Sequence, residues 1–111
     1  MSTYGNRIRR LRLARGLGLR EAAKLARISA TYLSRVELGR PVGRPSEPTL
    51  RRIARAIGDD PDALVLTAGI VPRSVIDIIL DDSDLVWLLR EIKAEGWTSD
   101  WILRQLRRQD P

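Results

Sequence analysis

The sequence predicts an all-α protein in two parts, from three observations. Apolar residues recur at helical spacing in several segments, and no segment alternates in the manner of a strand. Glycines and helix-capping residues separate these segments at short intervals. Residues 1–58 carry fourteen Arg or Lys against three Glu, a net charge of +11, whereas residues 59–111 carry six against eleven Asp or Glu, a net charge of −5. We therefore predict a basic helical domain at residues 1–69 and a small acidic helical region at residues 70–111.

The first predicted helix spans about residues 7–15, after a loosely held tail of six residues. Ile8, Leu11 and Ala14 recur at helical spacing and are expected to face inward, with arginines on the other face. The Gly-Leu-Gly sequence that follows ends this helix, and its leucine is expected to pack beneath the turn.

The next two predicted helices, residues 19–26 and 30–38, are short and joined by a tight turn. Three alanines share one face of the earlier helix, where small side chains let another helix cross at close range. Ser29 stands at the N-cap of the later helix, in which Leu33 and Val36 face the core. Two short helices joined in this way, the second of them basic, are typical of a helix-turn-helix.

Two further helices complete the predicted domain. The Gly-Arg-Pro repeat at residues 39–45 is not helical. Ser46 then caps a fourth helix, in which apolar residues recur at i, i+3, i+4 and i+7 up to Gly58. Asp60 caps a fifth helix at about residues 61–68, which begins with a proline at its first position.

The C-terminal region differs in kind from the first domain, because it is acidic and contains all three tryptophans. Its first helix, residues 73–80, is apolar almost all round. Asp82 or Ser83 caps a helix at residues 84–95, and a Thr-Ser pair begins a last helix near residue 99. About forty residues cannot bury this much apolar surface alone, so we expect them to pack on the first domain or on another copy.

The composition excludes several classes of protein. The chain has no cysteine for a disulfide or thiolate site and no histidine, the commonest general base and metal ligand, so we expect no enzyme and no cofactor. The acidic set Asp77, Asp81, Asp82 and Asp84 is better explained by caps and solvated faces than by a metal site. No apolar run approaches the roughly 20 residues that a bilayer span needs, which predicts a cytoplasmic, nucleoid-associated protein without a membrane partner.

One set of residues is specific as a group, because its members are individually common but occur here together and in one order along the chain. It consists of Arg12, Ala23, Ile28-Ser29, Arg35-Val36-Glu37, Gly39 and the run Pro45-Ser46, Thr49-Leu50 and Ile53-Ala54. On these residues the segment from about Gly5 to Leu66 resembles the Cro-like phage-repressor helix-turn-helix family, also called XRE. The resemblance implies a five-helix repressor-like domain that binds double-stranded DNA, and a buried ion pair between Arg12 and Glu37. The charge of residues 1–58 points independently to a polyanion.

The sequence departs from the family pattern in three places. Arg27 stands where the family usually has the turn glycine, so the turn has to form without easy access to positive φ. The loop between Gly39 and Pro45 is longer than usual. Leu19 replaces the polar residue that commonly opens the second helix, which removes one expected contact to DNA.

The resemblance also implies where bases would be read. Arg35 occupies a base-reading position of the family, and arginine can donate two hydrogen bonds to guanine O6 and N7. A phosphate contact or a solvated charge is the alternative for Arg35. Ala30 and Thr31 lie at the start of the recognition helix, where their methyl groups suit the thymine methyl, unless they are surface residues without a role.

Six further residues are predicted to contact the DNA backbone: Arg20, Ser29, Tyr32, Arg40, Arg44 and Arg51. Ser29 and Tyr32 suit phosphates better than bases, although Ser29 is equally explained as a helix cap. The four arginines lie early in their helices, whose N-termini favour phosphate, or directly after the recognition helix, where family members touch the backbone. For Arg40 and Arg44, which lie directly after the recognition helix, the alternative is that they belong to an inserted flexible loop.

The leading functional hypothesis is a transcriptional regulator, and specifically a repressor, that inserts the helix at residues 30–38 into the major groove. The C-terminal region would form a homodimer through Val75, Ile79, Trp87, Trp97 and Trp101. Two-fold pairing would set two recognition helices about 34–36 Å apart, or a multiple of this, on a pseudo-palindromic operator.

Two alternatives stay open for the C-terminal helices. They could fold back on the fifth helix, or bind a regulatory protein partner, as in an antitoxin or adaptor whose DNA-binding half autoregulates. A third class, an enzyme acting on nucleic acid, is disfavoured by the missing histidine.

Overall fold

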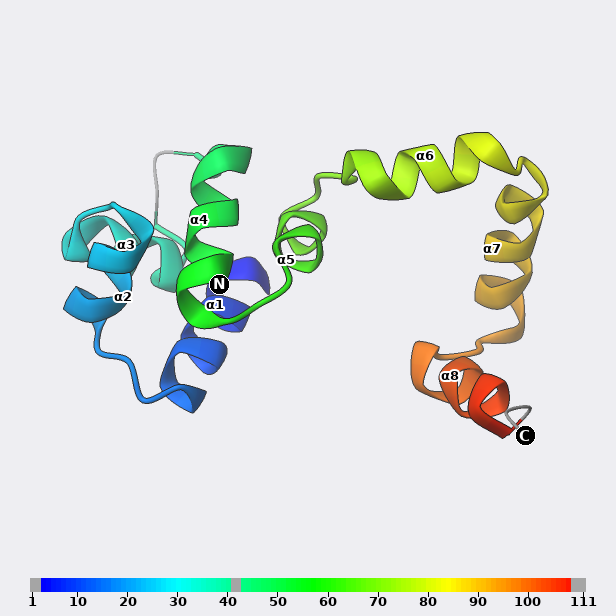
Figure 1. Ribbon diagram of the computed structural model, residues 1–111, viewed down its shortest axis with the longest axis horizontal. Coiled ribbons are helices and arrows are strands. Elements are labelled where there is room, and N and C mark those ends of the chain that lie inside the picture. The colour runs from blue at the N-terminus through cyan, green and yellow to red at the C-terminus, as the bar shows by residue number, and fades with distance from the viewer. Residues whose placement is uncertain (1–2, 41–42, 109–111) are drawn as a thin grey trace. The chain divides into compact units, whose positions relative to one another are not determined.

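The computed structural model describes residues 3–40 and 43–108, and all regular structure in this part of the chain is helical, as the sequence predicts (Figure 1). The helices are α1 (Thr3–Ala14), α2 (Leu19–Ala26), α3 (Ala30–Leu38), α4 (Glu47–Ile57), α5 (Pro61–Thr67), α6 (Arg73–Asp81), α7 (Asp84–Glu95) and α8 (Ser99–Arg108). The chain divides into an N-terminal unit that ends at Pro72 and a C-terminal unit that begins at Arg73.

The N-terminal unit has one hydrophobic core, to which all of its five helices contribute. Helix α4 contacts both α2 and α5, while α1 contacts α3, α4 and α5. The buried hydrophobic residues are Ile8, Ala22, Ala23, Ala26, Leu33, Val36, Leu50, Ile53, Ala54, Ile57, Leu64 and Val65. Helix α3 therefore rests on a continuous core and is held in a fixed orientation within this unit.

Helix α1 begins earlier than the sequence predicts. It starts at Thr3, so the expected loose tail is wrong from this residue onward, while Met1 and Ser2 lie outside the described residues. Tyr4 packs against the core and Gly5 is buried. Tertiary packing of this kind stabilises a helical turn whose own propensity is low.

A buried ion pair joins α1 to the end of α3, as the family resemblance implies. Arg12 Nε and Nη2 donate to the two Glu37 carboxylate oxygens at 2.7 and 3.0 Å, and Arg12 Nη1 donates to the Leu17 carbonyl at 2.8 Å. The hydrogen bond to Glu37 raises the pKa of Arg12 above its ordinary value. Arg12 lies one turn after Ile8 and continues the buried face, so Ala14 is exposed rather than inward as predicted.

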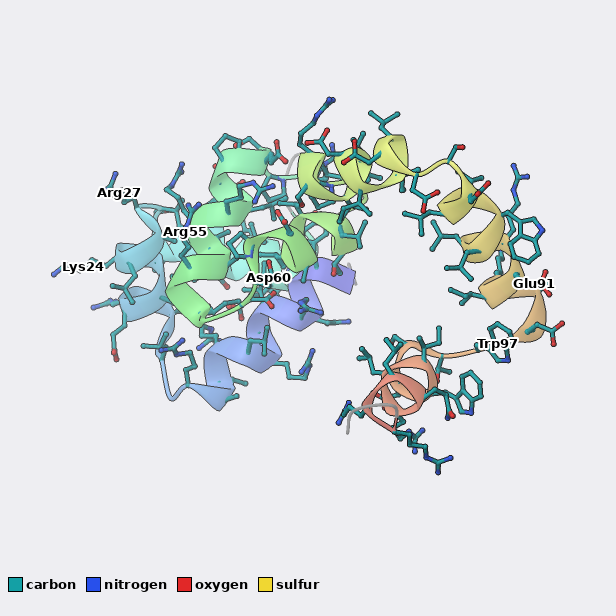
Figure 2. The ribbon with its side chains drawn as sticks, turned by 45° about the vertical axis from the view of Figure 1, so that its right-hand side comes forward. Lys24, Arg27, Arg55, Asp60, Glu91 and Trp97 are labelled. Carbon is teal, nitrogen blue, oxygen red and sulfur yellow. The ribbon has the colours of Figure 1, made fainter. Side chains whose placement is uncertain are left out.

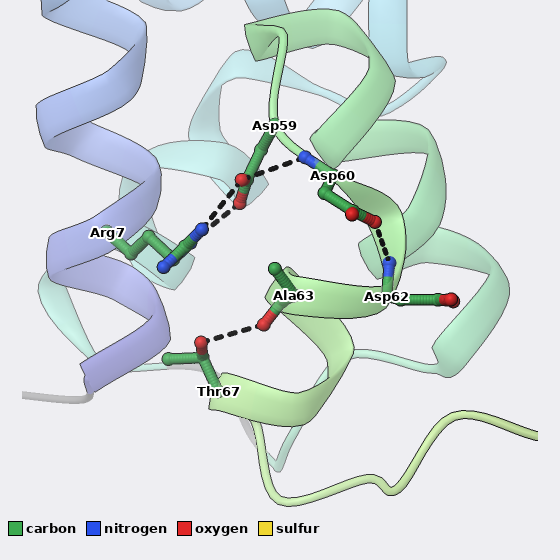
Figure 3. Close-up of polar contacts among 6 residues, drawn as sticks. All are labelled: Arg7, Asp59, Asp60, Asp62, Ala63 and Thr67. Carbon is green, nitrogen blue, oxygen red and sulfur yellow. Dashed lines mark hydrogen bonds and ion pairs between the residues drawn. The ribbon is translucent and has the colours of Figure 1, made fainter. Parts of the chain in front are cut away.

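A second ion pair joins α1 to the turn between α4 and α5 (Figure 3). Arg7 Nε and Nη2 donate to Asp59 at 2.7 and 2.8 Å, and the hydrogen bond to Asp59 raises the pKa of Arg7. Asp59 Oδ1 also accepts from the Asp60 backbone N–H at 2.9 Å. The predicted cap of α5 is confirmed, because Asp60 Oδ1 accepts from the Asp62 backbone N–H at 2.9 Å. This network fixes the start of α5 against α1.

The turn between α2 and α3 is built on a strained arginine. Arg27 is the C-cap of α2 and adopts φ 61° and ψ 41°, the left-handed conformation. It is the one non-glycine residue with positive φ in the described ranges. The sequence predicts a turn without easy access to positive φ because it lacks the glycine, but Arg27 itself adopts the left-handed conformation that glycine would adopt at lower cost.

Replacing Arg27 by glycine is expected to raise the free energy of unfolding. A side chain in the left-handed region costs about 1–2 kcal/mol. The greater freedom of glycine in the unfolded chain offsets about 0.4–1 kcal/mol of this gain. We expect the free energy of unfolding to rise by about 0.5–1 kcal/mol in total, and urea unfolding in a chloride buffer measures this change. Arg27→Ala removes the same charge but keeps the strain, so an equal gain in both variants would contradict this explanation.

The C-terminal unit consists of three short helices, none of which has a buried residue in its described part. Two polar caps organise it: Asp82 Oδ1 accepts from the Asp84 backbone N–H at 3.1 Å, and Thr98 Oγ1 accepts from the Trp101 backbone N–H at 3.1 Å. The division at Pro72 lies three residues beyond the predicted boundary, because Ile70 packs against the N-terminal core. In the described residues of this unit, local caps thus set where the helices begin, and no buried side chains hold the helices together.

Candidate nucleic-acid interface

Helix α3 is defined at both ends by side-chain and backbone caps. Ser29 Oγ accepts from the Tyr32 backbone N–H at 3.0 Å, which confirms its predicted role as N-cap. At the other end Gly39 adopts a left-handed conformation, and its N–H donates to backbone carbonyls of the last turn. Leu33 and Val36 are buried, so one face of α3 is committed to the core.

The opposite face of α3 exposes the residues predicted to read bases. Thr31 and Arg35 are both exposed and lie one helical turn apart, which places them side by side on the surface. Ala30 and Tyr32 are half-buried and pack partly against the core. Of the three residues predicted to read bases, Thr31 and Arg35 are therefore accessible and Ala30 is held partly inward, as is Tyr32, which is predicted to contact the DNA backbone.

One residue of this surface, Ser34, is not among the residues predicted to contact DNA. Ser34 is half-buried and lies three residues after Thr31 and four after Ala30, so it borders the same strip of α3. Helical spacing from these two residues was the signal that could have identified it.

The four arginines predicted to contact phosphates fall into two groups. Arg20 and Arg40 are exposed, and their side chains form no hydrogen bond or ion pair with a described residue. Arg44 Nη1, in contrast, donates to the Ala68 carbonyl at 3.0 Å. Arg51 donates to Asp62 at 2.9 Å and to Glu47 at 3.3 Å.

The partners of Arg51 change the expectation for this residue. The hydrogen bond to Asp62, together with a weaker one to Glu47, raises its pKa above the ordinary value. Two carboxylates next to one guanidinium leave no net positive charge at the site, so a phosphate would have to displace them. Arg44 and Arg51 thus have structural partners within the unit, whereas Arg20 and Arg40 are available to a ligand.

Two features of the described residues bear on other functions. No group of three or more His, Cys, Asp or Glu side chains in this part of the chain is arranged to hold a metal ion. In the same residues, no helix has both the length and the apolar composition needed to cross a membrane.

The fold and this surface define the class of protein, and comparison with known proteins gives the family. A family model described as a helix-turn-helix domain matches residues 3–66. The HTH-type transcriptional regulator DdrOP3 of Deinococcus deserti is 39% identical over 104 residues, which cover 86% of this chain and 72% of that protein. The chain therefore belongs to the helix-turn-helix family of DNA-binding transcriptional regulators, which are not enzymes.

Two solved structures are similar to this one. The crystal structure of the clp gene regulator ClgR from Corynebacterium glutamicum has a TM-score of 0.53 and 27% identity, over 79% of this chain and 87% of that one. The SinR protein/SinI protein complex has a TM-score of 0.51 and 22% identity, over 95% of this chain and 92% of that one, and shows the fold alone. The resemblance to XRE-like regulators predicted from the sequence is thus confirmed at the level of family and fold.

Proposed function

We propose that this protein is a sequence-specific transcriptional repressor, active in the cytoplasm at the nucleoid, that inserts α3 into the major groove of an operator. The observation that carries the proposal is the paired exposure of Thr31 and Arg35 on a helix whose other face is buried. A rigid helix that presents two side chains one turn apart can place both at base edges.

Charge supports the same surface. Residues 1–58 carry a net charge of +11, which attracts duplex DNA and releases condensed counterions on binding. Arg20 and Arg40 provide cations that have no partner in the part of the chain that the structure describes, and the N-cap Ser29 lies at the start of α3, where backbone N–H groups favour phosphate. Ala30 and Tyr32 complete the proposed contact set from half-buried positions. Arg44 donates one hydrogen bond to a neutral carbonyl and keeps other N–H groups for a phosphate, whereas Arg51 would join the set only by exchanging its two carboxylate partners.

Selection of bound sequences from random duplex DNA tests this proposal. The purified full-length protein is expected to enrich one pseudo-palindromic sequence with half-sites one helical turn, or a multiple of it, apart. Enrichment of no sequence above the starting pool would contradict sequence-specific recognition. A reporter gene placed behind the selected site then distinguishes repression from activation.

Arg35→Ala is expected to remove most of the preference for one base pair in each half-site. A bidentate contact from arginine to guanine is worth about 1–3 kcal/mol of discrimination, and alanine cannot supply it. The measurement is the ratio of dissociation constants for the selected site and for a random duplex of equal length. Arg40→Ala serves as the matched control, since it removes one exposed charge and should weaken binding to both duplexes alike. Equal ratios in wild type and Arg35→Ala would contradict the base-reading role.

The C-terminal unit is proposed to form the homodimer. Large apolar side chains on it are exposed, among them Trp87, whose exposed fraction is 65%. Trp97 and Trp101 stack with ring centroids 5.5 Å apart and an interplanar angle of 17°, and both remain partly exposed. Val75 and Ile79 lie one turn apart on α6 and are half-buried. Exposed aromatic and aliphatic residues of this kind are typical of the centre of a protein interface.

The same exposed surface favours one second candidate, a regulatory protein partner. An antitoxin or adaptor would use α6–α8 to bind that partner while the N-terminal unit autoregulates its own gene. The association state of the purified chain separates the two candidates, because a homodimer needs no second protein to cover the surface.

A further inference from the structure

A surface pocket with a volume of about 310 Å³ lies between the end of α2 and the middle of α4. Leu25, Arg27, Arg52 and Arg55 line it. Figure 2 labels Lys24 and Arg27 at the end of α2 and Arg55 on α4, the helix that α2 packs against. Two arginines of α4 and the arginine of the turn after α2 thus meet at one small hollow.

No carboxylate of the described residues forms an ion pair with the arginines of this pocket. The side chains of Arg27 and Arg55 form no hydrogen bond or ion pair with any residue of the described ranges. Arg52 donates only to neutral oxygens, to the Ala26 carbonyl at 3.0 Å and to Thr49 Oγ1 at 3.3 Å. Arg7, Arg12 and Arg51 of the same unit, in contrast, each donate to a carboxylate.

The C-terminus of α2 compensates only part of this positive charge. The carbonyl groups at the C-terminus of a helix are equivalent to about half a negative charge, which stabilises nearby cations. Three guanidinium groups exceed this by about 2.5 charges. The backbone of Arg27 is fixed, since its N–H donates to the Ala23 and Lys24 carbonyls, and Arg52 is held by its two hydrogen bonds. The pocket is therefore an organised cationic site with no anionic partner among the described residues.

We propose that this pocket binds a phosphate group. Guanidinium groups present planar pairs of N–H donors that match phosphate oxygens, and after its two internal bonds Arg52 keeps three of its five N–H groups free. Leu25, with an exposed fraction of 60%, provides an apolar wall for an organic group attached to the phosphate. The phosphate belongs either to a small phosphorylated ligand or to the backbone of duplex DNA, and the latter source rests on the proposed function.

A double variant and a matched control test this site. Arg27→Gln with Arg55→Gln removes two charges from side chains that have no hydrogen-bond or ion-pair partner within residues 3–40 and 43–108, so the fold should survive. Arg9→Gln with Arg10→Gln removes the same charge from exposed residues of α1, outside the pocket. The probe is inorganic phosphate, compared with chloride at equal ionic strength, in thermal unfolding of the full chain. Phosphate at ten times its Kd is expected to raise Tm by several degrees in wild type and control, but not in the double variant.

The salt dependence of duplex binding identifies the source of the phosphate. Each backbone phosphate neutralised contributes about −0.9 to the slope of log K against log salt. If the pocket holds a backbone phosphate, the slope for the double variant is less negative than the wild-type slope by about 0.9 or more. The slope for the control variant then equals the wild-type slope. An unchanged slope with a lost Tm shift assigns the pocket to a free phosphorylated ligand.

The proposal is wrong if phosphate stabilises wild type no more than chloride does and the two variants have equal slopes. A wild-type protein that binds no duplex at all would defeat the proposed function separately, while the phosphate titration would still decide the pocket.

Discussion

Replacing Arg12 by alanine is expected to lower the free energy of unfolding of the N-terminal unit by about 3–5 kcal/mol. The side chains of Arg12 and Glu37 have exposed fractions of 9% and 4%, so the variant leaves a carboxylate buried without its cation. It also removes the hydrogen bond to the Leu17 carbonyl. Since small domains are stable by only about 5–15 kcal/mol, a large part of the population should unfold at moderate temperature. Urea unfolding followed by circular dichroism measures the change.

Two further variants separate the buried charge from general effects of losing an arginine. Arg7→Ala removes the ion pair with Asp59, whose side chain is only 6% exposed, but the 31% exposed Arg7 side chain lies where water can replace it. Asp59 also keeps the hydrogen bond from the Asp60 backbone N–H, so the variant should cost less. Arg12→Met combined with Glu37→Leu removes both charges together and should recover most of the lost stability, because no charge is left unpaired. Tryptophan fluorescence, measured in parallel, reports on the C-terminal unit, which contains all three tryptophans. A cost for Arg12→Ala no greater than that for Arg7→Ala would contradict the explanation.

Most of the N-terminal fold could be predicted from the sequence, because local signals and packing agree there. Capping residues such as Ser29 and Ser46 stand directly before apolar residues at helical spacing, and the predicted starts of α3 and α4 agree with the structure. The start of α1 could not be predicted in this way. Its first turn depends on the packing of Tyr4 and Gly5 against a core that forms only in three dimensions.

The side chains of the candidate site were less predictable than the helix that carries them. Spacing on α3 identifies Thr31 and Arg35 as neighbours, and both are exposed. Sequence alone does not show that Arg51 pairs with Asp62, eleven residues away and on another helix. The cationic pocket was missed for a similar reason. Arg52 and Arg55 are three residues apart on α4, but their approach to Arg27 depends on how α2 crosses α4.

Ending the chain at Pro72 is expected to abolish dimerisation and to weaken binding to a two-fold operator by about 10²–10⁴-fold, because the two half-sites are then bound independently. The cut belongs after Pro72 and not after Gly69. Ile70 packs against the core, its N–H donates to the Val65 carbonyl at 2.9 Å, and the Pro72 side chain is fully buried. The shortened chain should therefore stay folded and bind a single half-site weakly. Sedimentation of both proteins and titration of one-site and two-site duplexes measure the effect.

A charge placed on the proposed interface gives the same test without truncation. Trp87→Glu introduces a carboxylate at a largely exposed position, so the monomer should fold normally, whereas a dimer would have to bury that charge. Leu13→Glu makes the equivalent apolar-to-acidic change on α1, where the exposed fraction is 56%, and should leave the dimer intact. We expect monomers for Trp87→Glu and dimers for wild type and Leu13→Glu at micromolar concentration. Two results would show that α6–α8 do not form the dimer: a wild-type chain that sediments as a monomer, or a chain ending at Pro72 that still dimerises. A monomeric wild type would leave the exposed apolar surface of these helices to a partner protein.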